Sequence, residues 1–365
     1  MKKTVDKPLL FSIITLVIAG FFIFSSASLG LLARGGNLYS NAAFSQTFFG
    51  LLLGSIAMMV TSRIPYKNWR KFAFPLFVLS MVVTSLVFVP GIGFEHGGAK
   101  RWLMFAGQSI QPSEFLKIGF IIYFAAWASV QKERIGTFKE GLLPFLIIIG
   151  LVGFLLLLQP DTDTFMVTFF AGLAMFLTAG GKWKHAFLLI ACSVIGILII
   201  ASFRPYVKQR ITTFVNPNAN GLTSGYQIQQ SLIAIGSGGL TGRGFGQSIQ
   251  KFEFLPEPIG DSIYAVASEE FGFLGAVLII LFFVIFAFRG LKIAARTDDL
   301  FGRLLVVGIV ILIVSQAFVN IGAMIGVLPL TGIPLPFVSH GGTALLITLA
   351  VVGIILNISK YHKKV

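Results

Sequence analysis

The sequence is short of cysteine, histidine and charge, and each shortage excludes a class of protein. Its single cysteine, Cys192, excludes a disulfide framework and a cysteine-ligated metal site. No two of its four histidines stand at the spacing of a helical metal motif such as HxxxH. Only 12% of the 365 residues are charged and 56% are hydrophobic, whereas a soluble domain is about 45 to 50% apolar. The composition therefore indicates a membrane protein that crosses the bilayer several times.

Long apolar runs are what the chain has instead. A spanning helix needs about 20 mostly apolar residues, and runs of about that length lie at 8–29, 43–61, 72–90, 112–130, 142–158, 164–180, 186–203, 263–288, 304–325 and 342–358. We predict an all-α polytopic membrane protein with ten transmembrane helices, organised as one integral membrane domain over residues 1–365.

The charged residues predict how these helices are oriented. Across the ten spans, 19 basic residues lie on the side of the two termini and eight lie on the opposite side. By the positive-inside rule both termini are cytoplasmic, and the net charge of +14 then needs no nucleic-acid partner. Nine of the 14 acidic residues lie outside or in the membrane, which indicates a polar working surface on the outer side.

The longest loop, residues 204–262 between the seventh and eighth spans, faces that outer side. Within it, Ile228, Leu232 and Ile235 share one face of a short helix that we predict to lie at the membrane surface. Residues 236–246 are rich in glycine but lack the Gly-Lys-Ser/Thr ending of a P-loop. They predict either a tightly turning loop or a backbone contact to a phosphate, and no bound nucleotide.

Asp261 is the first candidate for chemistry, because it stands on the outer side where the eighth span begins. Glu257 precedes it by four residues, but Pro258 and Gly260 lie between the two carboxylates. Proline and glycine disfavour a regular helix, so a shared helical face is not predicted. An Asp in this position is either a solvated helix cap or a general base for a reaction at the membrane surface.

Charged residues inside or beside other spans are a second group of candidates. Glu114 and Lys117 are three residues apart in the fourth span and therefore share one helical face. Charges in a bilayer commonly pair within the bundle, so these two form either a structural ion pair or a pair that positions the outer loops. Asp161 lies at the end of the fifth span, where a structural role is expected.

Several segments together resemble the SEDS family (shape, elongation, division and sporulation) of the FtsW and RodA type. The matching stretches follow the family's order over nearly the whole chain: Gly97–Trp102, Gln111–Lys117, Gln159–Asp161, Gly225–Gln227, Gly242–Gly246, Leu255–Glu257 with Asp261, Glu269–Gly272 and Pro334–Gly342. The segments at residues 255–258 and 269–272 favour an FtsW-like role in division over a RodA-like role in elongation. The chain departs from the family's common pattern at Asp163, at Ser262 and at 339–343.

The resemblance implies a multi-pass enzyme of the bacterial cytoplasmic (inner) membrane. Its activity would be that of a peptidoglycan glycosyltransferase, which polymerises lipid II, the undecaprenyl-pyrophosphate-linked disaccharide pentapeptide. The family's essential loop aspartate corresponds to Asp261, its interior Glu and Lys to Glu114 and Lys117, and its Gln-Pro-Asp motif to Asp161. Ser339 and His340 would support the site.

A lipid-linked pyrophosphate is an activated donor, so the reaction needs cations on the outer side and a base. Residues predicted to bind substrate are Lys100, Arg101, Arg210, Arg243, Lys251, Gln227 and Glu257. The cations act either alone or together with a divalent ion, Mg²⁺ or Mn²⁺. With Asp261 as the base, a single displacement would invert an α-linked donor to a β-linked glycan.

Two competing functions and a set of partners follow from the same features. A lipid II flippase would also have many spans and a buried charge pair, but we find no inverted repeat between the halves of the sequence. A cell-wall scaffold would need no outer acidic cluster. The sequence has no transpeptidase motif set, so peptide cross-linking requires another protein. The resemblance to the family implies a class B penicillin-binding protein as that partner, besides other proteins of the division or elongation complex. Gly322, Ala323 and Gly326 form either the packing surface for that partner or an internal contact.

Overall fold

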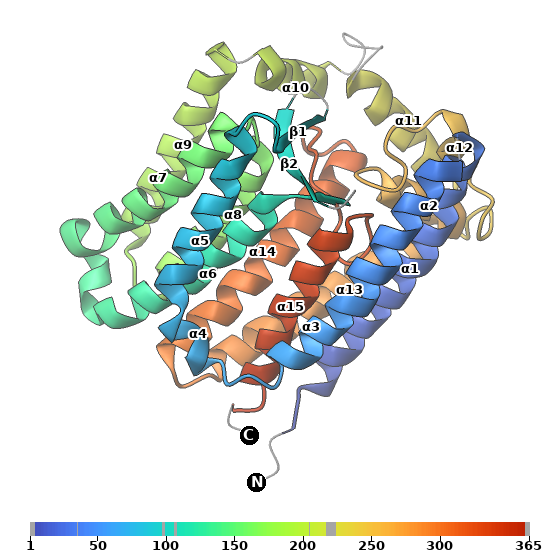
Figure 1. Cartoon of the computed structure of the whole chain (residues 1–365). Coiled ribbons are helices and arrows are strands. Elements are labelled where there is room, and N and C mark those ends of the chain that lie inside the picture. The colour runs from blue at the N-terminus through green and yellow to red at the C-terminus, as the bar shows by residue number, and fades with distance from the viewer. Residues whose placement is uncertain are drawn as a thin grey trace.

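Helices run side by side through most of the molecule (Figure 1). The computed structural model describes residues 4–34, 36–96, 99–105, 108–203, 205–216 and 224–361. Its longer elements are α1 (Lys7–Arg34), α2 (Gly36–Phe44), η1 (Ser45–Leu53), α3 (Gly54–Thr61), α5 (Ala73–Ser85), α6 (Pro112–Gln131), α7 (Leu143–Leu158), α8 (Thr162–Thr178), α9 (Trp183–Phe203), α10 (Pro205–Val215), α11 (Ser224–Ser237), α13 (Ile263–Ala295), α14 (Leu300–Met324) and α15 (Gly342–Ile358). Short pieces are α4 (Lys67–Lys71), η2 (Leu86–Phe88), η3 (Lys132–Gly136), η4 (Phe138–Leu142) and α12 (Gln250–Glu253).

The apolar runs of the sequence coincide with these helices. Within the described residues, seven helical stretches are long and apolar enough to cross a membrane, and three shorter apolar helices lie at Ala73–Phe88, Thr162–Thr178 and Gly342–Ile358. Each of the ten runs named above falls on one of them. The prediction of a mostly helical polytopic membrane protein is therefore confirmed in this coarser form.

The core of the bundle lies around α14. This helix is hydrophobic around its whole circumference, as expected of a helix surrounded by others, and it packs against α13, α8 and α6. By contrast, α9 lies at the edge of the bundle and exposes most of its side chains. A chain of aromatic rings fills the space between α6, α7 and α8, with ring centroids 5.2 to 5.7 Å apart at Phe120, Phe124, Phe145 and Phe176.

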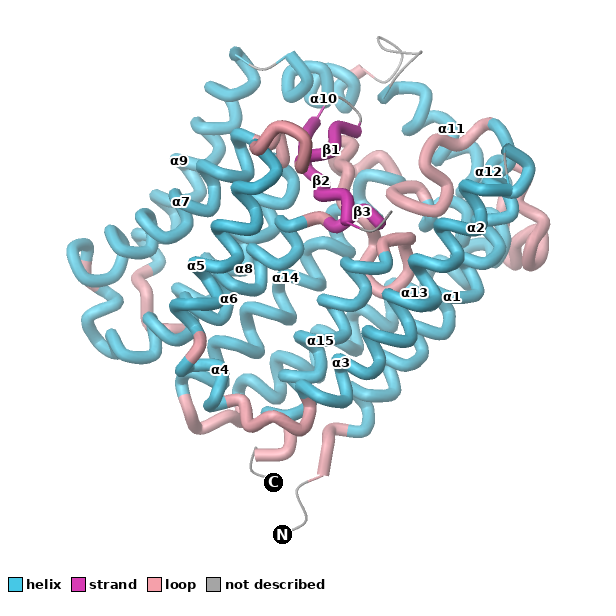
Figure 2. The backbone as a smooth tube through the Cα atoms, in the orientation of Figure 1, coloured by secondary structure: helices cyan, strands magenta, loops and turns pink. Residues whose placement is uncertain are grey.

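A small antiparallel sheet lies at one end of the bundle, beside α10 (Figure 2). Its strands are β1 (Gly93–His96), β2 (Ala99–Phe105) and β3 (Gln108–Ile110), in the order β1-β2-β3. The all-α expectation is incomplete here, because this segment is too polar and too rich in glycine to continue as a helix. Strand geometry matters for function, since successive side chains of β2 point to opposite faces of the sheet.

The glycine-rich loop forms backbone hydrogen bonds to α13 on both sides of a break in that helix. Gly272 has φ 66° and ψ −165°, so the helix is interrupted there. The loop supplies the missing backbone partners: Arg243 N and Gly244 N donate to the carbonyls of Glu269 and Glu270 at 3.0 Å, and Phe273 N and Leu274 N donate to Gly239 O and Leu240 O at 2.8 and 3.1 Å. A Cβ at Gly242 would lie 2.1 Å from Glu270 O, so the contact needs glycine. Of the two predicted uses of this loop, the tightly turning loop matches these contacts.

The short helix predicted in the long loop is present as α11, but its orientation differs from the prediction. Ile228 is buried as expected, whereas Leu232 is 44% exposed. The face turned towards the bundle instead carries Ser231 and Ala234, both fully buried. α11 packs on α13 and α14, and a helix–helix contact of this kind favours small side chains.

Candidate active site

Three contacts fix the backbone at Asp261, directly before α13 begins. The amide of Asn320, on α14, donates to the carbonyl oxygen of Asp261 at 2.8 Å and to that of Ile333 at 2.8 Å. The hydroxyl of Ser339 donates to Gly260 O at 2.7 Å, and the backbone N–H of His340 donates to Ile259 O at 2.7 Å. The peptide that carries Asp261 is therefore held from two directions by the core of the bundle.

A tight turn presents Asp261, as the proline and glycine around it predict. Glu257 has φ 45°, and its carbonyl accepts hydrogen bonds from Gly260 N at 3.1 Å and Ser262 N at 3.2 Å. The two carboxylates, Glu257 and Asp261, thus lie on a turn and not on one helix. Gln227, from α11, donates to the hydroxyl of Ser262 at 3.0 Å, which ties α11 to the same turn.

The carboxylate of Asp261 lies in an environment that favours its protonated form. The side chain is half-buried, and it has no hydrogen-bond or ion-pair partner within the part of the chain that the structure describes. Burial raises the pKa of Asp261 to about 7, with further increases from the negative charges of Glu257 and Asp163 and decreases from Arg210 and Arg101. A carboxyl group with a pKa near 7 can accept and release a proton at neutral pH.

Two arginines reach this site from different elements. Arg101, on β2, donates to the carbonyl of Gln159 at 3.2 Å and also to that of Pro160. Arg210, on α10, forms an ion pair with Asp163 of α8 at 2.6 Å. Both guanidinium groups are close enough to lower the pKa of Asp261, so the structure brings two of the predicted substrate cations to the predicted base.

Asp161 caps the start of α8 beside Arg101. Its Oδ1 accepts from Thr164 N at 3.4 Å, and its Oδ2 is buried without a partner among the described residues. Burial raises the pKa of Asp161, and the charge of Arg101 opposes that increase. The structural role expected for Asp161 agrees with this cap, which places the first turn of α8 beside the site.

The other predicted cations lie elsewhere. Lys100 is next to Arg101 on β2 and is exposed, because neighbouring residues of a strand face opposite ways. Arg243 pairs with Glu269 at 3.5 Å. Lys251 is fully buried, so its predicted role as a cation for a pyrophosphate does not fit its position.

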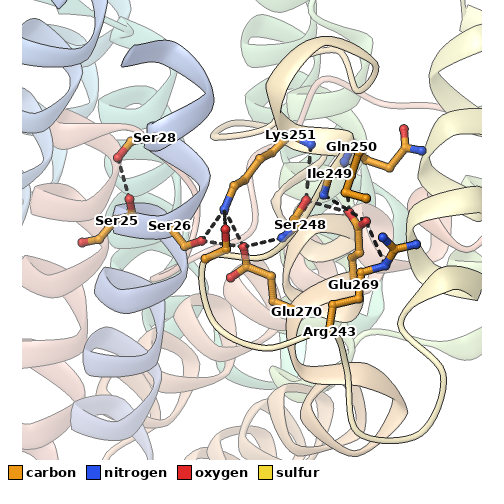
Figure 3. Close-up of polar contacts among 11 residues, drawn as sticks. Ser25, Ser26, Ser28, Arg243, Ser248, Ile249, Gln250, Lys251, Glu269 and Glu270 are labelled. Carbon is orange, nitrogen blue, oxygen red and sulfur yellow. Dashed lines mark hydrogen bonds and ion pairs between the residues drawn. The ribbon is translucent and has the colours of Figure 1, made fainter. Parts of the chain in front are cut away.

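Lys251 is the centre of a buried polar cluster, shown in Figure 3. Its Nζ donates to Glu270 at 2.7 Å, to the hydroxyl of Ser26 at 2.8 Å and to Gly246 O at 2.8 Å. An ammonium group has three donors, and all three are used. The cluster joins α1, α12 and the outer part of α13.

Glu269 occupies the neighbouring part of the same cluster (Figure 3). Its carboxylate accepts from the hydroxyl of Ser248 at 2.6 Å and from the backbone of Ile249 and Gln250 at 3.1 and 3.3 Å. Arg243 adds the ion pair at the exposed edge. We define residues Ser26, Arg243, Ser248, Lys251, Glu269 and Glu270 as the α1–α13 cluster.

Glu114 and Lys117 form a buried ion pair at 2.7 Å. Glu114 also lines a cavity of about 20 Å³ together with Ser339 and His340, and this volume is about enough for one water molecule. Burial lowers the pKa of His340 to about 4, so its ring is neutral at pH 7, and the ring stacks on Phe24 at 5.7 Å. The predicted supporting residues Ser339 and His340 thus connect the Glu114 region to the turn before Asp261.

Asn320, Gln46 and Asp163 take part in the site although the sequence did not identify them. The Gln46 amide bridges Ser339 O at 3.2 Å and Gly341 N at 3.0 Å. Asn320 could have been found, because an amide within an apolar span needs hydrogen-bond partners. For Gln46 the signal is the same, whereas the pairing of Asp163 with Arg210 depends on tertiary structure.

Among the described residues, no three His, Cys, Asp or Glu side chains lie together in a group that could hold a metal ion. Mg²⁺ is commonly held by one or two carboxylates together with substrate phosphates, so the divalent ion stays a prediction.

Sequence comparisons place the chain among known bacterial proteins. A family model described as "Cell cycle protein", for FtsW, RodA and SpoVE, matches residues 7–364. Stage V sporulation protein E of Bacillus subtilis (strain 168) is 40% identical over 311 residues, which cover 85% of each chain. A probable peptidoglycan glycosyltransferase FtsW of Trichlorobacter lovleyi is 38% identical over 360 residues, covering 97% of this chain and 93% of the relative.

Solved structures give the same result for the fold. One chain of a peptidoglycan synthase complex, described as coordinating polymerization and crosslinking, matches with a TM-score of 0.80 and 25% identity, over 98% of this chain and 99% of that chain. The rod shape determining protein RodA of Thermus thermophilus matches with a TM-score of 0.70 and 25% identity, over 99% and 98% of the two chains.

Proposed function

The chain belongs to the FtsW, RodA and SpoVE family of cell cycle proteins and is a peptidoglycan glycosyltransferase; we propose that it polymerises lipid II with Asp261 as general base. One observation carries the assignment of the base. The half-buried Asp261 carboxylate has no partner among the described residues, its pKa is raised to about 7, and two arginines lie near it. A structural carboxylate would instead be paired.

The reaction follows from these groups. A sugar hydroxyl of the acceptor attacks the anomeric carbon of the lipid-linked sugar, and its proton passes to the Asp261 carboxylate. The bond between that carbon and the pyrophosphate oxygen breaks, and undecaprenyl pyrophosphate leaves with the electron pair. Arg101 and Arg210 stabilise the negative charge that develops on the pyrophosphate. One displacement inverts the configuration at the anomeric carbon.

The orientation of the bundle in the membrane is part of the proposal. Ten spans carry one integral domain over residues 1–365, with both termini in the cytoplasm and the loop 204–262 outside. Support comes from the placement of the elements: α1 begins and α15 ends at the same end of the bundle, whereas the sheet, α10 and α11 lie at the opposite end (Figure 1). Asp6 N also donates to the hydroxyl of Ser359 at 3.1 Å. The site would then face the outer side of the cytoplasmic membrane, where lipid II is polymerised.

Partnership with a class B penicillin-binding protein is proposed because the chain has no transpeptidase motif set. The similar peptidoglycan synthase complex, which coordinates polymerization and crosslinking, supports such an assembly. Gly322 and Ala323 do not form the contact surface, because both are buried and a Cβ at Gly322 would lie 2.8 Å from the side chain of Leu328. Relatives named FtsW and SpoVE favour a role in division or sporulation.

Product analysis tests the function. The purified protein, with its transpeptidase partner, is incubated with lipid II, and we expect glycan polymer together with undecaprenyl pyrophosphate. The Asp261→Asn variant should form neither product. Glu253→Gln is the matched control, since Glu253 is an exposed carboxylate of the same loop, and it should retain activity. Lipid II that crosses vesicle membranes without forming polymer would show a flippase instead.

A further inference from the structure

We propose that Asp163 is a positioning residue for Asp261, holding the Arg210 guanidinium and the 331–332 backbone beside the proposed base. One Asp163 oxygen, Oδ2, makes both contacts: it accepts from Arg210 at 2.6 Å and from the backbone N–H of Gly332 at 3.1 Å. An added Cβ on Gly332 would lie 3.7 Å from Oδ2 of Asp261. The contact between Asp163 and Gly332 therefore lies next to the Asp261 carboxylate.

The ion pair also links α10 to the start of α8. Arg210 is in the middle of α10, and its partner is buried in the first turn of α8. The Arg210 side chain is 26% exposed and that of Asp163 is 8% exposed, so the carboxylate is an internal anchor and the guanidinium closes over it. Without this anchor, α10 would lose its ion pair to the bundle next to the site.

Asp163 acts on Asp261 electrostatically as well. The charged groups that influence Asp261 come from β2 (Arg101), α8 (Asp163), α10 (Arg210) and the turn before it (Glu257). From α11 and α14 come neutral amides, Gln227 and Asn320. The negative charge of Asp163 raises the pKa of Asp261, and the positive charge of Arg210 lowers it. Removing the charge of Asp163 should therefore lower the pKa of Asp261, whereas removing the charge of Arg210 should raise it.

The first test is the pH dependence of polymerisation, which rests on the proposed function. Asp163→Asn keeps the shape of the side chain but removes its charge. The acid limb is the part of the pH–rate profile in which the rate falls as Asp261 becomes protonated. We expect Asp163→Asn to move this limb to lower pH by about 0.5 to 1 unit, and Arg210→Gln to move it to higher pH. Glu253→Gln, whose carboxylate is exposed and is not among the charges that shift the pKa of Asp261, should leave the limb in place. A purely structural role would lower the rate without moving the limb.

The second test does not need activity. Because the pKa of Asp261 is raised from 3.8 to about 7, its ionisation opposes folding, and Asp261→Asn should raise Tm at pH 8. In the Asp163→Asn background this increase should be smaller, because the repulsion that Asp261 experiences is reduced. If Asp163→Asn does not fold, the same comparison in Arg210→Gln should give a larger increase.

The outcomes separate the inference from the function. If neither the Tm increase nor the acid limb responds to Asp163→Asn and Arg210→Gln, the positioning role is overturned. If the Tm increase responds but Asp261→Asn still polymerises lipid II, the inference stands and the proposed base is wrong. Opposite shifts of the acid limb in Asp163→Asn and Arg210→Gln would support the positioning role of Asp163 and the role of Asp261 as base.

Discussion

Two pairs of acidic residues lie on either side of the start of α13, and they differ in how many hydrogen bonds and ion pairs their carboxylates receive. Glu269 and Glu270 are buried and receive hydrogen bonds and ion pairs from the α1–α13 cluster. Glu257 and Asp261 lie on the turn before α13, 12 and 8 residues before Glu269, and have no such partners among the described residues. The paired carboxylates hold segments together, whereas the unpaired ones remain available for proton transfer.

The difference is one of compensation. A buried charge is tolerated when ion pairs and hydrogen bonds replace the lost water, and Glu269 receives both from Arg243, Ser248 and two backbone amides. Asp261 lacks this compensation, so its pKa rises to about 7. Residues of identical chemistry therefore acquire different roles from their surroundings alone.

The largest effect should come from Asp261→Asn. An amide is a very weak base, so we expect the polymerisation rate to fall by about 10² to 10⁴-fold. The folded state should not suffer, since the variant removes an ionisation whose cost to stability grows as the pH rises from 3.8 to about 7. The rate with lipid II and Tm at pH 8 check this, and a near-normal rate would refute the assignment of Asp261.

Breaking the paired region should instead damage stability. Lys251→Met strands the Glu270 carboxylate in the core, and loss of one partner of a buried pair typically costs about 3 to 5 kcal/mol. We expect a large decrease in Tm. The double variant Lys251→Met/Glu270→Gln should recover part of the loss, since no buried charge is left unpaired.

The double variant of Lys251 and Glu270 can contradict the idea that paired carboxylates stabilise this region. If the double variant is as unstable as the sum of the two single variants, Lys251 and Glu270 do not stabilise each other. The α1–α13 cluster would then owe its stability to packing and not to compensation of charge.

The Glu114–Lys117 pair should behave as a smaller unit of the same kind. Neutralising either residue leaves a charge in the bundle, whereas replacing both with apolar residues of similar size should cost less. A double-mutant cycle of unfolding should give a coupling energy of about 0.5 to 3 kcal/mol. Additive losses would show that the 2.7 Å contact contributes no interaction energy.

The smallest effect is expected for Arg243→Gln. The Arg243 side chain is 37% exposed, and ion pairs in contact with water contribute about 0 to 1 kcal/mol. Glu269 keeps its contacts to Ser248 and to two backbone amides. Thermal unfolding should therefore show a small change, and a loss as large as that of Lys251→Met would mean that Arg243 belongs to the buried part of the cluster.

The sequence predicts the helices well, because apolar runs of spanning length are rare outside transmembrane helices. It also singles out Asp261 as the candidate base, since a carboxylate at the start of a span is unusual and the family motifs surround it; that role stays a prediction. The sheet at 93–110 was missed, because three short strands in a polar segment have no strong periodicity. Lys251 was misplaced for a different reason: a basic residue in an outer loop looks solvated until its partner Glu270 is seen.

The break at Gly272 divides α13 into two rods. The outer rod, residues 263–271, is about 14 Å long, with Asp261 just beyond one end and Glu270 near the other. Through Lys251, that second end is fastened to Ser26 of α1. One end of the outer rod is thus bonded to the first helix of the chain through Lys251, and the other end lies next to the proposed base. The inner rod is tied to the same region, because Arg289 pairs with Asp6 directly before α1 and the glycine-rich loop bonds to residues on both sides of Gly272.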